Sequence, residues 1–179
     1  EQSLRFLNDK AKDLGTQYKI SINIEQIPGE TVAVKLHDAD ALIYGDEVSE
    51  APLYSNQFLE LWKDASVWER MDIDGALNKL YTGGGIVHFN ISDKPTASQV
   101  KKLVEYSIKS GSEHFALNAV YSECENAHTT FGNYDICPKC GGKVIEKYTR
   151  VVGFMTPISS WNNVRRDWEF ERRVFKKID

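Results

Sequence analysis

The chain has 179 residues, of which 41% are hydrophobic and 27% are charged. This composition is typical of globular proteins, and the length suits one domain, or one domain with a small appended module. A net charge of −4 is too small to indicate a nucleic-acid or membrane surface. There is no apolar run of about 18 residues, and the charged opening residues 1–10 do not resemble a signal peptide. We therefore expect a cytoplasmic protein that binds neither nucleic acid nor a membrane.

The first part of the sequence predicts helices joined by less regular segments. Apolar residues at spacings of three and four predict a helix over residues 2–14, closed by Gly15. Alternating apolar and polar residues predict a strand over residues 18–24. A second helix is expected from residue 30 to the glycine at position 45, and a third over residues 69–80.

The middle of the sequence predicts a strand, a helix and a second strand. The strands are expected over residues 86–91 and 114–121, and the helix begins at Thr96 and ends at Gly111. Such a βαβ unit places its two strands parallel with a right-handed crossover.

After residue 121 the character of the sequence changes. Residues 122–143 are polar and rich in Cys and Gly without a regular period, and residues 144–152 are a β-branched run. Ser159 or Ser160 is expected to cap a last helix. The buried side of this helix is predicted to carry Trp161, Val164, Trp168 and Phe175. A solvated helix face is the expected location of the basic residues Arg165, Arg166, Arg172, Arg173, Lys176 and Lys177.

The three cysteines, Cys124, Cys137 and Cys140, lie within 17 residues of one another. An odd, clustered set indicates a metal in a reducing compartment rather than a disulfide framework. Together with His128 they form the pattern Cys-x3-His-x8-Cys-x2-Cys. The glycine at 141 permits a tight turn directly after Cys140. Three thiolates and one imidazole are a common closed set for structural zinc. The alternative is that Cys124 and His128 are incidental and no metal binds.

Five short motifs then carry a resemblance to a known family. In chain order they are Pro28-Gly29-Glu30, Tyr54-Ser55-Asn56, Thr82-Gly83-Gly84, the Cys-Pro-x-Cys-Gly module, and Arg150-Val151-Val152-Gly153-Phe154. Their order resembles the C-terminal portion of class III anaerobic ribonucleotide reductases over essentially the whole chain. The last motif is similar to the glycyl radical segment of that family, which implies that Gly153 holds a radical. The alternative for Gly153 is a plain turn glycine after a strand.

The resemblance implies an α/β fold. It would be a fragment of the glycyl radical enzyme barrel, which has two parallel half-sheets with outer helices. The implied division is a barrel part over residues 1–121, a zinc ribbon-like module over 122–149, and the glycyl radical loop with a C-terminal helix over 150–179. Glu25, Gln26 and Glu30 would then fall near the barrel interior. The glycines at 83–85 are expected to form a structural turn rather than a phosphate cradle, because no helix starts directly after them.

The resemblance also implies cofactors and partners. An activase that uses S-adenosylmethionine and an iron–sulfur cluster would generate the Gly153 radical. That radical would then produce a cysteine thiyl radical that removes the ribose 3′ hydrogen of a ribonucleotide. The implied partners are the rest of the reductase chain, the activase, the ribonucleotide substrate and, in a homodimer, a second copy.

Two departures from the family pattern limit what this chain does alone. The family supplies its first zinc pair as Cys-x2-Cys, whereas Ala127 stands at the matching position here and His128 follows it. No cysteine precedes Cys124, although the thiyl-forming cysteine of the family lies upstream. We therefore expect a C-terminal segment that is inactive alone. The competing hypotheses are a stand-alone zinc-ribbon interaction module and a glycyl-radical spare-part subunit.

Overall fold

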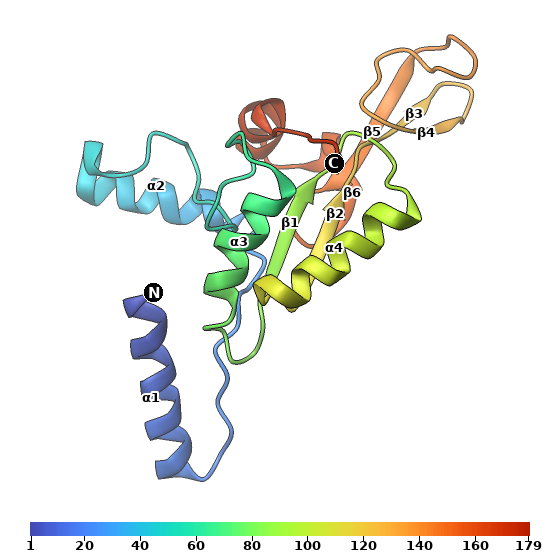
Figure 1. The fold of residues 1–179 in the computed structure, drawn as a ribbon. Coiled ribbons are helices and arrows are strands. Elements are labelled where there is room, and N and C mark those ends of the chain that lie inside the picture. The colour runs from blue at the N-terminus through green and yellow to red at the C-terminus, as the bar shows by residue number, and fades with distance from the viewer.

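The computed structural model describes residues 1–179 and has a mixed α/β fold with two separate sheets. The helices are α1 (Gln2–Tyr18), α2 (Val32–Tyr44), α3 (Val67–Asn78) and α4 (Ala97–Ser110), with short turns η1 (Gly45–Glu47), η2 (Ile158–Ser160) and the π-helix η3 (Val164–Phe170). The strands are β1 (Ile86–Asn90), β2 (His114–Asn118), β3 (Tyr121–Cys124), β4 (Thr129–Phe131), β5 (Val144–Arg150) and β6 (Met155–Pro157). Figure 1 shows α1 as an arm extending away from a body built around β1 and β2.

The predicted strand–helix–strand unit is present. Strands β1 and β2 pair in parallel from Ile86↔His114 to Asn90↔Asn118, with α4 between them in the chain. Helix α4 begins with a capping box, in which the Thr96 hydroxyl accepts from the Gln99 amide and the Gln99 side chain accepts from the Thr96 amide. It ends at Gly111, whose φ of 82° suits glycine. The predicted start and end of this helix are confirmed.

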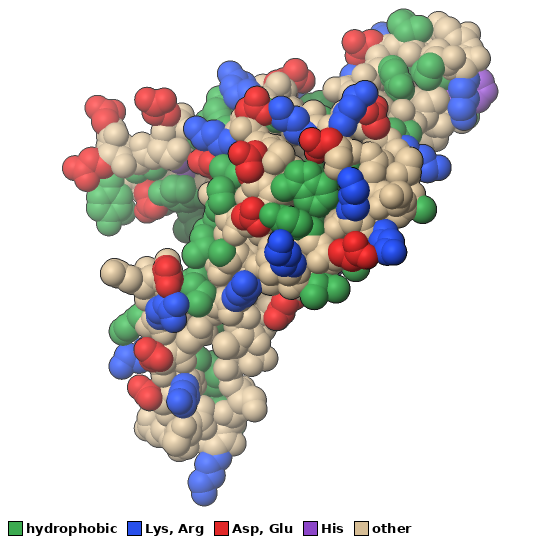
Figure 2. Space-filling model, in the orientation of Figure 1, with side chains coloured by type: hydrophobic (Ala, Val, Ile, Leu, Met, Phe, Trp, Pro, Cys, Tyr) green, Lys and Arg blue, Asp and Glu red, His purple; other side chains and the backbone are tan.

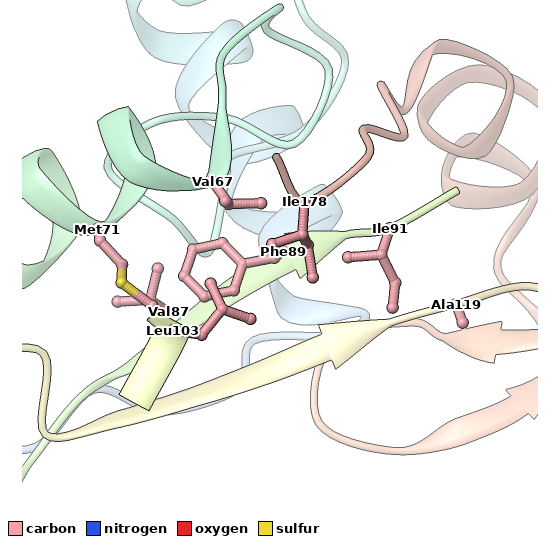
Figure 3. Close-up of a cluster of buried hydrophobic side chains, with 8 residues drawn as sticks. All are labelled: Val67, Met71, Val87, Phe89, Ile91, Leu103, Ala119 and Ile178. Atoms are coloured by element: carbon pink, nitrogen blue, oxygen red, sulfur yellow. The ribbon is translucent and has the colours of Figure 1, made fainter. Parts of the chain in front are cut away.

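The main core lies where α3 and α4 cover the two-stranded sheet. Figure 3 shows the inward side chains of α3 and α4 meeting those of β1 around the ring of Phe89. The cluster comprises Val67, Met71, Val87, Phe89, Ile91, Leu103, Ala119 and Ile178. Because Ile178 belongs to the final residues, the end of the chain is tied into the same core as β1.

Phe89→Ala should lower the free energy of unfolding by about 3–5 kcal/mol, because a fully buried ring leaves a cavity that the surrounding elements cannot close. Phe89 is 0% exposed and also contacts Phe115 with ring centroids 5.8 Å apart. Phe6→Ala is the matched control, since Phe6 is 60% exposed. Urea unfolding of the two variants checks the expectation; equal midpoints would contradict it.

The second sheet is antiparallel, in the order β4-β3-β5-β6. It extends away from the body, with the β3–β4 end outermost (Figure 1). Strand β2 ends at Asn118 rather than continuing to residue 121, because the chain crosses there into β3 of this second sheet. Residues 122–143, for which no regular pattern was predicted, therefore include β4 and most of β3. The β-branched run over 144–152 contains β5, which ends at Arg150.

The predicted N-terminal elements need two corrections. Helix α1 continues past Gly15 to Tyr18, because Lys19 takes the left-handed conformation at φ 55° and caps the helix by donating to the Gly15 carbonyl. The predicted strand over residues 18–24 is wrong. This segment has no neighbouring strand, and the nearest pairing is the isolated bridge Glu25↔Gly84.

The predicted last helix is also only partly correct. A single 3₁₀ turn holds Ser159 and Ser160, and the following π-helix η3 has Asn163 at its N-cap instead. Trp161 is buried as predicted, but Val164 and Trp168 are only half-buried. The fully buried positions of η3 are Arg165, Glu169 and Phe170. The basic residues are thus not a solvated face throughout, because Arg165 and Arg173 are buried.

The two N-terminal helices expose many large apolar side chains. Figure 2 shows hydrophobic side chains on the outer surface of α2 and along α1. The exposed residues there include Phe6, Leu7, Leu14, Tyr18, Val32, Leu36, Leu42, Ile43 and Tyr44. None of the helices combines the length and the apolar character that a bilayer crossing requires.

Candidate metal centre and glycine turn

The predicted metal ligands come from two tight turns at the outer end of the second sheet. Cys124 and His128 flank the β3–β4 turn, in which the Cys124 amide donates to the His128 carbonyl at 3.1 Å. Ala127 allows this turn by taking a φ of 58°. The second turn holds Cys137 and Cys140, and the amide of the residue after Cys140 donates back to the Cys137 carbonyl at 2.9 Å.

The four ligand atoms converge. All lie within 4.8 Å of one another, with Cys124 Sγ 3.8 Å from Cys140 Sγ and Cys137 Sγ 3.9 Å from His128 Nδ1. In a tetrahedral site with metal–sulfur bonds of about 2.3 Å, neighbouring sulfurs are about 3.8 Å apart. The spacing of this donor set therefore fits a zinc ion. Because all four donors would be used, no position is left open for a substrate.

The surroundings shift the pKa values of two thiols of this centre in opposite directions. The side-chain amide of Asn126 lies 3.5 Å from Cys140 Sγ, and this hydrogen bond, with that of the Gly142 amide, lowers the pKa of Cys140 to about 6. Burial instead raises the pKa of Cys124, which is 1% exposed. A bound cation would oppose that effect, because metal ligation deprotonates a thiol.

Strand β5 connects this centre to the turn that contains Gly153. Its first residue, Val144, pairs with Cys124, and its last, Arg150, pairs with Met155 of β6. The turn between β5 and β6 is closed by a hydrogen bond from the Val151 amide to the Phe154 carbonyl at 3.1 Å. Gly153 thus lies at the tip of a short hairpin that continues the metal-bearing sheet.

Gly153 is half-buried and does not need a left-handed backbone. It is absent from the glycines with positive φ, and a methyl group added to it would meet only Pro28, at 3.5 Å from Cγ. The guanidinium of Arg150 donates to the Gly153 carbonyl. Steric demands of the fold therefore do not account for glycine at this position, since alanine would fit.

Behind this turn lies a buried cluster of three charges, which the sequence pattern did not reveal. Glu169 forms ion pairs with both Arg165 and Arg173, four residues before and after it. The three side chains are 3%, 3% and 0% exposed, in the order Arg165, Glu169, Arg173. The Arg-x3-Glu-x3-Arg spacing was the available signal, because residues four apart share one helix face. We name these three residues the charge ladder.

A small cavity lined by both polar and apolar side chains lies between the charge ladder and β1. Its buried residue His88 has Nδ1 3.2 Å from Asn118 Oδ1, and its Nε2 has no protein partner. Burial lowers the pKa of His88 to about 4, so the imidazole is neutral at physiological pH. Val151 and Val152 also line this cavity, which places it directly beside the glycine turn.

Glu25, Gln26 and Glu30, which were expected near a barrel interior, differ in burial and in hydrogen bonding. Gln26 is half-buried and structural, because its side-chain amide donates to the Asn56 carbonyl at 2.6 Å and its side-chain oxygen accepts from the Ile86 amide at 3.0 Å. Glu25 is exposed. Glu30 is half-buried and one of its carboxylate oxygens is buried without a partner.

The glycines at 83–85 pack as a structural turn. The Gly83 amide donates to the Ile24 carbonyl at 2.8 Å, and a side chain at Gly85 would collide with Asn78. This geometry agrees with the expectation of a turn that anchors the N-terminal segment beside β1.

The fold and the site together define a mixed α/β protein with a four-donor metal-binding cluster. One strand joins this cluster to a turn whose glycine the fold does not require. The sequence pattern of the family described as "Anaerobic ribonucleoside-triphosphate reductase" matches residues 1–175. The chain therefore belongs to the anaerobic ribonucleoside-triphosphate reductase family, and the resemblance drawn from its motifs is confirmed.

Solved structures agree with this assignment. A structure described as "Anaerobic ribonucleotide reductase" matches with a TM-score of 0.85 and 31% identity, over 97% of this chain and 28% of that chain. The Thermotoga maritima enzyme in complex with dATP and CTP matches with a TM-score of 0.77 and 32% identity, over 92% of this chain and 27% of that chain. The same enzyme with glycerol in the active site matches with a TM-score of 0.78 and 31% identity, over 93% of this chain and 27% of that chain. No curated protein matches by sequence. This chain thus spans between a quarter and a third of the length of these structures.

Proposed function

We propose that this chain is the C-terminal portion of an anaerobic reductase that converts ribonucleoside triphosphates to deoxyribonucleotides and stores its radical on Gly153. The observation that carries the proposal is a glycine that the fold does not require, at the tip of a hairpin with the family's radical motif. Family membership supports the reaction class. The CTP and dATP bound to the Thermotoga maritima enzyme support nucleotides as ligands.

The chemistry of a backbone radical explains the choice of glycine. An unpaired electron on an α-carbon is stabilised when the adjacent nitrogen and carbonyl are coplanar with it, and a side chain opposes that planarity. Glycine also has two α-hydrogens and no Cβ, so an activating radical can approach the α-carbon closely. Once formed, the radical would remove a hydrogen atom from a cysteine thiol, and the resulting thiyl radical would remove the ribose 3′ hydrogen. The protein supplies positioning and exclusion of water.

Zinc is the metal that we propose for the four-donor cluster, with Cys124, His128, Cys137 and Cys140 as its ligands. The donor set and its spacing support it. Bound zinc would cross-link the β3–β4 turn to the turn before β5. Its role would be structural, because it would hold β3 and the start of β5, the strand that leads to Gly153, in place.

The proposed assembly comprises the rest of the reductase chain, a homodimeric second copy, and an activase that uses S-adenosylmethionine and an iron–sulfur cluster. The exposed apolar surfaces of α1 and α2 support further protein contacts in the complete enzyme. Within it, β1 and β2 would contribute to a barrel of two parallel half-sheets with outer helices.

Electron paramagnetic resonance of the complete reductase, activated without oxygen by its activase, tests the proposed function. We expect a glycyl doublet and reduction of a ribonucleoside triphosphate. A chain that acts only as a zinc-ribbon interaction module would show neither the doublet nor turnover. A spare-part subunit would show the doublet only after docking on a separate enzyme.

The isolated 179-residue chain should show no ribonucleotide reduction, even with activase and reductant. Its three cysteines are all assigned to the metal cluster, so none remains to form the thiyl radical. The measurement is deoxyribonucleotide formation under strictly anaerobic conditions, with the complete reductase as the positive control. Turnover by the isolated chain would require a thiyl radical on a cluster cysteine and would contradict the structural assignment of the metal.

A further inference from the structure

Arg173 holds the backbone immediately before the glycine turn. Its guanidinium donates to the Arg150 carbonyl and to the Val151 carbonyl, both at 2.7 Å. These are the last residue of β5 and the first residue of the bend that leads to Gly153. The guanidinium also lies 4.9 Å from the ring centroid of Trp161. Arg173 is therefore fixed on one side by packing and directs its donors at the glycine turn.

Arg165 holds the segment that faces Gly153 from the other side. Its guanidinium donates to the Glu30 carbonyl at 2.7 Å and to the Gly29 carbonyl at 2.9 Å. The residue before them, Pro28, is the one that an added methyl group on Gly153 would meet. The two arginines thus hold the two segments that lie on either side of the glycine α-carbon.

Glu169 joins these two arginines into one rigid unit. It accepts from Arg173 Nη2 at 2.6 Å and from Arg173 Nε at 3.1 Å, and its other oxygen accepts from Arg165. A buried ion pair adds little net stability by itself, because desolvation of the charges offsets their attraction. What the charges add is direction, because guanidinium groups form several hydrogen bonds in fixed geometry.

We propose that the charge ladder, with Arg173 as its main positioning residue, sets the position of the Gly153 α-carbon for hydrogen-atom transfer. This inference rests on the proposed radical function of Gly153. Neither arginine touches the reacting atoms. They act through the carbonyls of residues 150–151 and 29–30, which fix where the hairpin tip lies relative to Pro28.

Hydrogen-atom transfer is sensitive to such positioning, because a displacement of about 1 Å costs on the order of 100-fold in rate. Arg173→Lys keeps a positive charge next to Glu169, but a single ammonium group cannot reach Glu169 and both carbonyls in the same geometry. The proposal therefore predicts loss of radical formation and turnover without loss of substrate binding.

The test uses the complete reductase with Arg173→Lys, compared with Arg172→Lys as the matched control. Arg172 is the exposed neighbour, and its guanidinium packs on Trp168. Circular dichroism and zinc content report the fold, and electron paramagnetic resonance reports spin yield and the doublet splitting. For Arg173→Lys we expect spin yield and kcat to fall about tenfold or more, with KM for the nucleotide unchanged. The control should match the wild type.

If Arg173→Lys loses zinc or helix content, the variant has not folded correctly, and Glu169→Asp then tests the proposal in its place. It keeps the buried negative charge but retracts the carboxylate, so that the two arginines are no longer bridged together. The same loss of spin yield with unchanged KM is expected. Wild-type yield and splitting in a folded Arg173→Lys or Glu169→Asp variant would overturn the proposal. Absence of a glycyl doublet in the wild type would instead overturn the proposed function on which it rests.

Discussion

Gly153→Ala is expected to abolish the glycyl doublet and all turnover of the activated reductase while leaving the fold intact. Both effects follow from the geometry of the turn. The added methyl group would meet Pro28 at an ordinary contact distance of 3.5 Å, and the backbone of Gly153 is not in the left-handed region. The free energy of unfolding should therefore change by no more than about 1 kcal/mol. The radical should be lost because the methyl group opposes planarity at the α-carbon and obstructs access to its hydrogen.

Exposure to air gives an independent measurement of the same residue. A carbon-centred radical on the backbone combines with oxygen, and the peroxyl species that forms ends by breaking the chain at that residue. Mass spectrometry of the activated wild-type reductase after air exposure should find a new fragment that begins at or next to Gly153. The Gly153→Ala variant should yield none.

Gly45→Ala serves as the control for this variant. Gly45 caps α2 with a φ of 56° and lies in open space, so its replacement tests a glycine with a conformational role. It should cost about 1–3 kcal/mol of stability and keep the doublet. A doublet that survives in Gly153→Ala, or cleavage that maps to Gly84 or Gly132, would show that another glycine holds the radical.

Local signals in the sequence were sufficient to predict the βαβ unit and the four candidate metal donors that the fold brings together. The capping residue Thr96 and the terminating Gly111 act within one turn of the helix that they limit, so their effect can be read directly from the sequence. The same holds for Cys137 and Cys140, whose spacing sets their geometry. The resemblance located Gly153 by its motif, and the structure adds that the fold itself does not need a glycine there.

Two of the failures involve contacts between distant parts of the chain. The alternating isoleucines of residues 18–24 have strand character, but strand formation also requires a partner strand, and none lies beside them. The burial of Arg165 could not be predicted either, because its partners at residues 29 and 30 are more than 130 positions away. On sequence spacing alone, an Arg-x3-Glu-x3-Arg pattern predicts an exposed helix face with ion pairs between its charges.

Removal of one metal ligand should have the second largest effect, through the strand that links the cluster to Gly153. Cys140→Ser replaces a thiolate with a hydroxyl, which is a poor zinc ligand, and structural zinc contributes about 10–16 kcal/mol to the folding of small zinc domains. Bound zinc in the variant should fall below about half an equivalent, against one in the wild type. Without the metal, the pairing Cys124↔Val144 at the start of β5 has little to hold it, since the outer end of this sheet has few buried apolar side chains.

The consequence should extend along β5 to the glycine turn. Amide hydrogen exchange should accelerate over residues 121–150, while α3, α4 and β1 keep their protection, because their core around Phe89 does not include the metal-bearing turns. Spin yield on Gly153 should fall together with zinc content. Lys139→Ala is the matched control. Lys139 lies between Cys137 and Cys140, but its side chain only donates to the Thr129 carbonyl at the surface. If Cys140→Ser kept a full equivalent of zinc, or lost zinc with an unchanged radical yield, the metal would not be what positions the glycine turn.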